Sequence, residues 1–304
     1  MDTVQAAQHA FEAGIEHFKR EEYDQAIACF EQGLAWATNQ ANRELEAHLR
    51  LLIGQSAFEL DDVPRAREEL VQAHELFRQL GDRSKQAHTR RELGELTFWH
   101  EQYELAQRHY RRALELLQEI ESDDIETLAL IHTRLGAIAF EQEELDIAHT
   151  HYQQALACYH QLGDTVSAAN LLIELATNVQ PEDPNRAREL FEQGHLLAQQ
   201  AGDEYLASVA LHGLGVLAAD NGRLDEAVSW YRQALTLKEH CGDQEGQIFT
   251  YLALGAAYRE LGRIDQARAA WQQALRLAKH EEFEDVVVVV RALIESRVED
   301  WLRS

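Results

Sequence analysis

Apolar residues recur along the chain at the spacing of helices that bury one face. Leu49, Ile53 and Ala57 form one such set, and Leu211 and Leu214 begin another. Positions three to four residues apart share one side of an α-helix, so each set predicts an amphipathic helix. Equivalent stretches follow one another through the sequence, separated by short polar or glycine-containing segments. The pattern predicts an all-α protein built from consecutive helices.

Small and bulky residues repeat with a period near 40 residues. The first small slot is a glycine in six units and an alanine in the fifth: Gly14, Gly54, Gly94, Gly136, Ala176, Gly215 and Gly255. A bulky residue follows in every unit: Phe30, Leu70, Tyr110, Tyr152, Phe191, Tyr231 and Trp271. A glycine inside a helix costs about 1 kcal/mol relative to alanine, so its recurrence indicates a packing requirement. The sequence predicts seven helix pairs in which the bulky side chain fills the space above the small residue.

Glycine and proline mark the turns between the expected helices. Gly-Asp pairs separate several units, at 81–82, 163–164, 202–203 and 242–243. Glycine ends a helix in the left-handed conformation, and aspartate caps the next one. All three prolines, Pro64, Pro181 and Pro184, fall at the turn inside a unit. The fifth unit has a rearranged turn as well as Ala176, so we expect a local irregularity near residues 174–187.

The spacing of these small residues resembles the tetratricopeptide repeat, in a variant with a period near 40 residues. The resemblance covers residues 5–280 and implies a right-handed superhelical solenoid whose first helices line a concave groove. We therefore expect a single solenoid over residues 1–304, closed by a C-terminal capping helix at 284–304. The seven expected repeats lie at about 5–40, 45–81, 85–122, 126–163, 166–202, 205–242 and 246–280.

The charge of the chain limits its partners. Its 28 Lys and Arg against 53 Asp and Glu give a formal net charge of −25. Such a surface repels phosphate backbones and anionic membranes, so no nucleic-acid or membrane partner is expected. Cys29, Cys158 and Cys241 lie far apart and imply no disulfide framework. Because no signal peptide or long apolar stretch is visible either, we expect a cytoplasmic protein.

Polar, cationic and aromatic residues concentrate on the first helices of units two to four. The candidate groove residues are His48, Gln55, Phe58, His88, Arg91, Glu95, Phe98, Trp99, Arg134 and Phe140. Between positions 83 and 112 there are seven Lys or Arg against four Asp or Glu, a local reversal of sign that also includes Arg90. On one interpretation these arginines bind carboxylates of a partner, and reversing the charge of Arg91 and Arg134 leaves the fold unchanged. On the other, they pair with neighbouring acids such as Glu92 and Glu95, and the aromatic residues serve packing.

The sequence offers little for catalysis or for a cofactor. The densest group of metal-ligand residue types is His149, His151, Cys158 and His160. No pair among them has the spacing of four residues that a helical zinc site uses. No nucleophile motif or glycine-rich phosphate loop is present, since 14 of the 16 glycines occupy repeat slots and only Gly213 and Gly246 do not. We expect no enzyme activity, no metal and no cofactor.

The C-terminal segment is apolar on two sides. Val287, Val290, Ile294, Val298 and Trp301 form one stripe, and Val286, Val289 and Leu293 form a second. A terminal helix must cover the last apolar face of a solenoid, which explains the first stripe. The second stripe is either part of the same cap or a contact for a homodimer or partner.

Together these features predict an interaction scaffold or adaptor that binds a protein or peptide in the groove, and on the first interpretation of the arginines that partner has an acidic segment. The alternative is a regulator that senses a ligand or peptide and changes its superhelix pitch. Many functions share this fold, so the adaptor hypothesis rests on analogy.

Overall fold

The computed structural model describes residues 3–281 and 283–295, and every regular element in these ranges is an α-helix. Seven helix pairs are followed by a fifteenth helix, which confirms the predicted all-α solenoid of paired helices. Within the described ranges, no helix is long and apolar enough to cross a membrane. The chain divides by its internal contacts into two compact units, Met1–Leu162 and Gly163–Ser304. The single solenoid over residues 1–304 stays a prediction.

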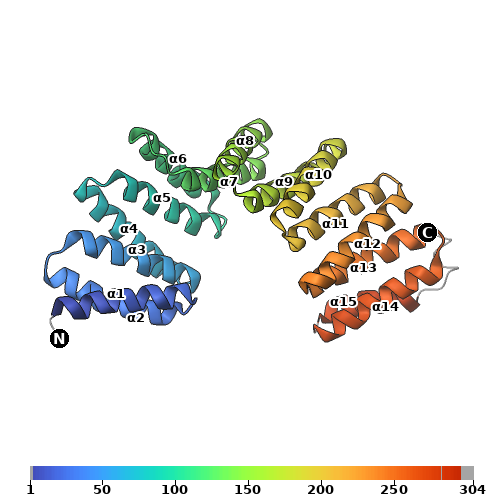
Figure 1. The fold of residues 1–304 in the computed structure, drawn as a ribbon, viewed down its shortest axis with the longest axis horizontal. Coiled ribbons are helices and arrows are strands. Elements are labelled where there is room, and N and C mark those ends of the chain that lie inside the picture. The colour runs from blue at the N-terminus through green and yellow to red at the C-terminus, as the bar shows by residue number, and fades with distance from the viewer. Residues whose placement is uncertain (1–2, 282, 296–304) are drawn as a thin grey trace. The chain divides into compact units, whose positions relative to one another are not determined.

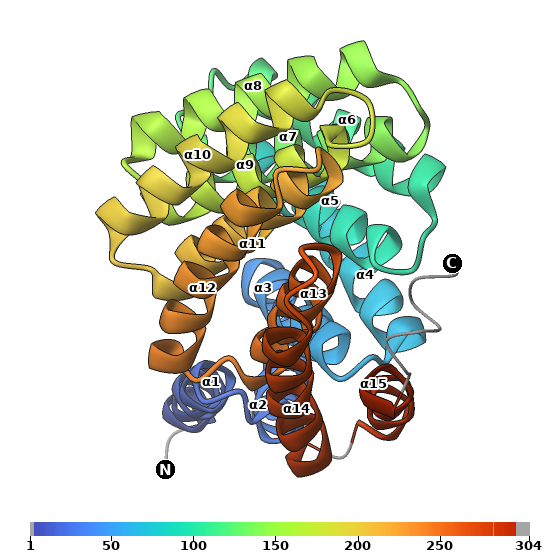
Figure 2. The ribbon, with the colours of Figure 1, turned by 90° about the vertical axis from the view of Figure 1, so that its right-hand side faces the viewer.

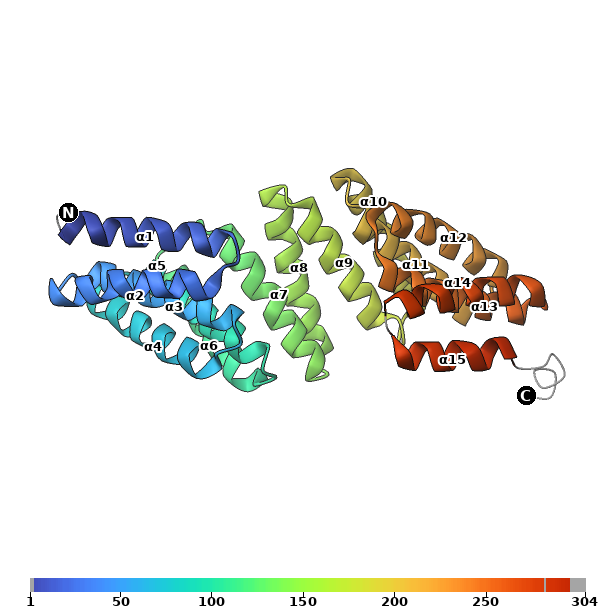
Figure 3. The same ribbon diagram turned by 90° about the horizontal axis from the view of Figure 1, so that it is seen from below.

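The first unit contains four helix pairs stacked in chain order (Figure 1). Each helix packs against the next, and α1 and α2 run side by side in Figure 3. The first helices of successive pairs also touch, because α3 contacts α5 and α5 contacts α7. The bounds are α1 (Thr3–Lys19), α2 (Tyr23–Asn39), α3 (Arg43–Glu59), α4 (Val63–Leu80), α5 (Arg83–Phe98), α6 (Tyr103–Glu119), α7 (Ile125–Glu141) and α8 (Leu145–Leu162).

The second unit contains three helix pairs and the last helix. The bounds are α9 (Thr165–Val179), α10 (Pro184–Ala201), α11 (Glu204–Asp220), α12 (Leu224–Cys241), α13 (Gln244–Glu260), α14 (Ile264–His280) and α15 (Glu284–Glu295). Figure 2 shows α15 beside α14, against which it packs. The first helices again touch across pairs, since α9 contacts α11 and α11 contacts α13.

The recurring glycines bring each pair of helices into close contact, as the repeat predicts. A Cβ placed on Gly94 would lie 2.5 Å from Cε1 of Tyr110, far inside ordinary contact distance. Gly14 faces the ring of Phe30 and Gly136 faces the ring of Tyr152 in the same way. These rings are fully buried, so the glycine and the bulky residue are one packing unit. This confirms why glycine recurs inside these helices despite its low helix propensity.

The fifth pair departs from this arrangement, and the structure gives a physical reason. Helix α9 carries Ala176 where the other first helices of pairs carry glycine, and the ring of Phe191 lies instead against Gly213 of the next pair. Gly213, which had no role in the sequence pattern, is therefore the partner of Phe191. The turn from α9 to α10 also contains no left-handed residue, whereas every other turn within a pair has one, such as Glu21 or Gly222.

The predicted turn chemistry is confirmed. Gly81 ends α4 with φ of 74°, and Asp82 then accepts a hydrogen bond from the backbone N–H of Lys85. Pro64 and Pro184 lie in the first turns of α4 and α10, where a backbone N–H has no intrahelical acceptor, so the missing N–H of proline costs nothing.

The last helix covers the end of the second unit through a buried side chain. Val290 is fully buried against the core, and Val287 and Ile294 pack partly against it. Of the second predicted stripe, Val286 and Leu293 are also half-buried against this core, and Val289 is 56% exposed. Its neighbour Val288 is exposed as well. Val298 and Trp301 lie outside the described residues.

Candidate functional site

The candidate site lies on the side formed by α3, α5 and α7, which we call the first-helix face. A hydrogen bond joins α3 to α5, where Gln55 Nε2 donates to Glu92 Oε1 at 2.7 Å. Arg91 forms an ion pair with the same carboxylate, and His88 Nε2 lies 3.4 Å from it. Burial raises the pKa of Glu92, and the charge of Arg91 opposes that rise. Three predicted site residues, Gln55, His88 and Arg91, thus surround one buried carboxylate.

A second buried carboxylate joins α5 to α7. Arg134 Nε donates to both oxygens of Glu95 at 3.1 Å, and its Nη2 lies 3.0 Å from Oε2. The hydroxyl of Tyr110 donates to Glu95 Oε1 at 2.6 Å. Burial and the nearby Glu95 charge raise the pKa of the Tyr110 hydroxyl, so it stays a donor. Glu95 is only 7% exposed, and the hydrogen bonds from Arg134 and Tyr110 compensate for the loss of water around its carboxylate.

The arginine of this pair also lies over two aromatic rings. The guanidinium carbon of Arg134 is 4.9 Å from the ring centroid of Phe98 and 5.2 Å from that of Trp99. Phe98 is half-buried, but Trp99 is 60% exposed at the end of α5. Phe58 and Phe140 are half-buried on α3 and α7. Trp99 is therefore the aromatic side chain of the site that offers most surface to a partner.

A hollow of about 270 Å³ lies next to these residues, between the first half of α5 and the start of α7. His88 and Arg91 line one side of it, and Asp124, Glu126 and Thr127 line the other. Both signs of charge are thus present, which suits hydrogen-bonding groups of a partner better than an apolar side chain.

Three basic side chains of the same first helices, His48, Arg90 and His132, do not join this site. The ring of His48 packs edge-on against Phe77 of α4 at 5.1 Å. Arg90 Nη1 donates to His109 of α6 at 3.2 Å, and His132 meets His151 of α8 at 3.0 Å. These three side chains point toward second helices of pairs, so the predicted cationic cluster is divided between two sides of the first unit.

The pairing changes what a charge reversal would do. Arg91 and Arg134 both compensate carboxylates that are less than 10% exposed. Glutamate at either position would place two negative charges together in a buried environment. The expectation that the fold tolerates both reversals is therefore at odds with the geometry, and the internal pairing that the sequence left open is present.

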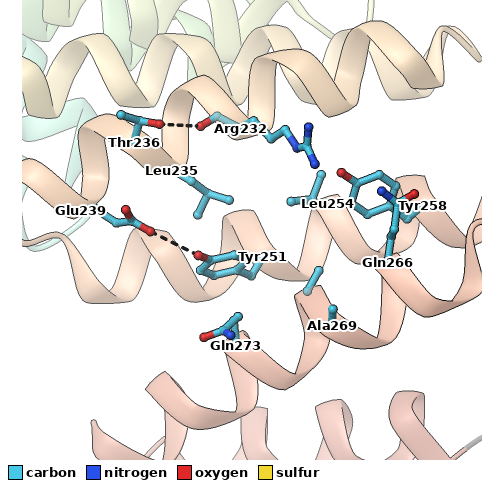
Figure 4. Close-up of a pocket in the computed structure, with 11 residues that line it drawn as sticks. Arg232, Leu235, Thr236, Glu239, Tyr251, Leu254, Tyr258, Gln266, Ala269 and Gln273 are labelled. Atoms are coloured by element: carbon cyan, nitrogen blue, oxygen red, sulfur yellow. Dashed lines mark hydrogen bonds between the residues drawn. The ribbon is translucent and has the colours of Figure 1, made fainter.

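Sequence reasoning missed a larger hollow of about 430 Å³ among α12, α13 and α14 (Figure 4). Arg232 lies at one end, 6.0 Å from the ring centroid of Tyr258. Glu239 lies at the other end and accepts a hydrogen bond from Tyr251 at 3.3 Å. The adjacent small residues of α14, Ala269 and Ala270, leave this space open and were the available signal in the sequence.

Burial keeps several histidines neutral. It lowers the pKa to about 4 for five of them: His74, His88, His109, His132 and His212. In the part of the chain that the structure describes, no group of three or more His, Cys, Asp or Glu is arranged to hold a metal ion. Cys29 and Cys158 are half-buried, as gap-filling residues would be, whereas Cys241 is exposed.

The fold defines a class of helical repeat proteins, and sequence comparison identifies the family. Models of the tetratricopeptide repeat match residues 5–81 and 205–280. The chain belongs to the tetratricopeptide repeat family. No curated protein sequence matches it significantly.

Solved structures of similar fold are distant in sequence. The apo form of RapI aligns with a TM-score of 0.65 at 14% identity, covering 91% of this chain and 98% of its own. The apo quorum sensor NprR from B. thuringiensis aligns with a TM-score of 0.65 at 13% identity, covering 99% and 85%. NprR in complex with its cognate peptide NprX aligns with a TM-score of 0.52 at 14% identity, covering 100% and 89%. These similarities support the fold.

Proposed function

We propose that this protein is a non-enzymatic interaction scaffold of the cytoplasm that binds a protein or peptide segment on its first-helix face. The carrying observation is the exposed indole of Trp99 beside the guanidinium of Arg134. A large aromatic side chain and an arginine, supported by a buried hydrogen-bonded layer, are typical of binding hot spots. The buried carboxylates hold this surface rigid before a partner arrives, which lowers the entropy cost of binding.

The polar part of the face supports recognition of a peptide chain. Arg91 uses one terminal nitrogen for Glu92, and its side chain lines the hollow together with His88. A carboxylate of an acidic partner segment would find a cation there, while Asp124 and Glu126 accept hydrogen bonds from peptide N–H groups. The solved complex of NprR with its peptide NprX supports a peptide ligand for this type of solenoid.

Selection from a random peptide display library tests the proposal directly. Peptides retained by the wild-type chain are measured by fluorescence polarisation against wild type, Trp99→Ser and Tyr205→Ser. Tyr205 is a matched control because it is 54% exposed and lies beside a cation, Lys238, in the other compact unit. We expect Trp99→Ser to weaken binding by about 30-fold, the loss of a hot-spot residue, and Tyr205→Ser to have no effect.

Far-UV circular dichroism of each variant shows whether the helices are intact. Peptides that bind wild type and Trp99→Ser equally would move the contact away from this face. A library that yields no peptide would contradict a peptide-binding scaffold.

A ligand-sensing regulator is the second candidate, and the description of NprR as a quorum sensor favours it. The two candidates differ in what the selected peptide does. A sensor changes its dimensions in small-angle X-ray scattering when the peptide is added, whereas a scaffold keeps them.

A further inference from the structure

Arg90 lies away from the first-helix face, among α4, α5 and α6. Its equivalent in the previous pair is Arg50. Arg50 precedes the recurring glycine of its helix, Gly54, by four residues, as Arg90 precedes Gly94. Arg50 is held between two carboxylates: Nη1 is 2.8 Å from Glu69 and Nη2 is 3.3 Å from Glu46. All three side chains are less than 20% exposed, so the charge of Arg50 is compensated within a largely buried ion-pair triad.

Both carboxylates are missing around Arg90. The slot of Glu46 is occupied by Gln86, and the slot of Glu69 is occupied by His109. Gln86 donates to a backbone carbonyl of α4, and His109 accepts from Arg90 Nη1 at 3.2 Å. Arg90 forms no ion pair with any carboxylate in the described part of the chain, and its buried Nε has no hydrogen-bond partner there. The repeat thus keeps the cation of the triad and omits its counter-charges.

The surroundings of Arg90 are neutral or positive. His109 accepts from a guanidinium, so its Nδ1 carries no proton and its Nε2–H is a donor. Burial together with the charge of Arg90 lowers the pKa of His109 to about 4, and Arg108 and Arg67 add to that effect. Burial and the nearby Arg112 also lower the pKa of Arg90.

Other acids near this cluster are already engaged. Glu75, the acid close to His74, forms an ion pair with Arg78. Glu115 and Glu119 both pair with Arg112. A half-buried guanidinium in such surroundings is costly unless an anion from outside the chain compensates it.

We propose that Arg90, with His109 and the exposed Arg67 and Arg108, forms a binding site for a compact oxyanion, a phosphate or a carboxylate. The anion takes the electrostatic role that Glu46 and Glu69 have beside Arg50. It accepts from the free donors of Arg90 and from His109 Nε2–H, and the two exposed arginines attract it from solvent. The site is separate from the first-helix face and does not depend on the function proposed for it.

Thermal unfolding in matched salts tests the site. Midpoints are measured at pH 7.5 and constant ionic strength in chloride, phosphate and acetate, for wild type and Arg90→Gln. General salt effects change both proteins alike, so the difference between them reports the site. We expect a saturable rise of about 3 °C in wild type at ten times the dissociation constant and none in Arg90→Gln. A rise with phosphate alone identifies a phosphate ligand, and a rise with acetate identifies a carboxylate.

A second variant separates binding from simple loss of stability. His109→Glu rebuilds the pair found between Arg50 and Glu69, so it should raise the midpoint in chloride and abolish the response to the anion. The matched control is His151→Glu, at the same slot of the next pair, where the facing residue is His132 instead of an arginine. It should not raise the midpoint.

Line broadening of the phosphate signal in ³¹P NMR gives a direct readout. If phosphate raises the unfolding midpoint, broadening is expected with wild type and not with Arg90→Gln or His109→Glu. Equal anion responses in wild type and Arg90→Gln would overturn the proposal, as would an unchanged response in His109→Glu or the lack of any specific response in wild type.

Discussion

Replacing Gly94 by alanine tests whether the recurring glycines are packing residues. In an exposed helix the change would stabilise the protein by about 1 kcal/mol, because alanine is the better helix former. Here the new Cβ would lie 2.5, 2.7 and 2.8 Å from Cε1, Cδ1 and Cζ of Tyr110. Tyr110 is fully buried and cannot turn aside, so its ring or the helix axis must shift.

The magnitude follows from two costs and one gain. Overpacking a buried site costs about 1–3 kcal/mol. A shift of the ring also weakens the hydrogen bond from Tyr110 to the buried carboxylate of Glu95, which contributes about 1.5–3 kcal/mol. Subtracting the helix propensity gained by alanine, about 1 kcal/mol, we expect Gly94→Ala to lower the free energy of unfolding by about 1.5–5 kcal/mol when that hydrogen bond is broken.

Gly33→Ala is the matched control in another helix of the same unit. Its Cβ would lie 3.3 Å from the two terminal methyl groups of Leu49, which can move by the small distance required. We expect this variant to be as stable as wild type or slightly more stable. Urea denaturation followed by far-UV circular dichroism measures both. A Gly94→Ala protein at least as stable as wild type would refute the packing argument.

Three further predictions follow from caps, ion pairs and buried histidines. Asp203→Ala removes the side chain that accepts a hydrogen bond from the backbone N–H of Leu206. We expect it to lower the free energy of unfolding, measured by urea denaturation, by about 1 kcal/mol. Arg134→Gln leaves Glu95 buried without its cation and should lower the free energy of unfolding by about 3 kcal/mol. Its control, Arg186→Gln, breaks an exposed ion pair and should lower the free energy of unfolding by less than about 0.5 kcal/mol. The five histidines with a pKa near 4 bind protons more tightly when unfolded, where the pKa is about 6.5. Stability should therefore fall as the pH drops from 6.5 to about 4, with about four protons taken up on unfolding at pH 5, and a proton uptake near zero in a pH-dependent unfolding series would contradict their burial.

Much of the architecture is readable because one local rule repeats. A glycine and a bulky residue sixteen positions later, such as Gly94 and Tyr110, define both helices of a pair and their contact. The exception was visible only in part. Ala176 indicates that the fifth pair differs, and the extra Gly213 is present in the sequence, but only the packing shows that the ring of Phe191 lies against Gly213 of the next pair.

The candidate site was harder to predict than the fold. Adjacent residues on a helix point about 100° apart, so Arg90 and Arg91 could not both face the same side. The helical period gives that angle, but it does not show which residue of the second helix of the pair lies opposite each arginine. His109 faces Arg90, whereas Glu92 pairs with Arg91 within the same helix. Which arginine is neutralised depends on these partners, and composition alone counts both as equal contributions to a basic patch.

The contact between Phe191 and Gly213 has a consequence for how this chain can change in length. Tandem arrays grow and shrink when a whole repeat is duplicated or lost, which requires each repeat to carry both halves of its own packing contact. Most pairs here meet that condition, because glycine and ring belong to the same pair. The fifth pair does not, since its ring is complementary to the sixth. Because Gly215 of α11 in turn packs against Tyr231 of α12, residues 165–241, which hold the fifth and sixth pairs, form the smallest cassette that recombination can move intact at this point of the chain.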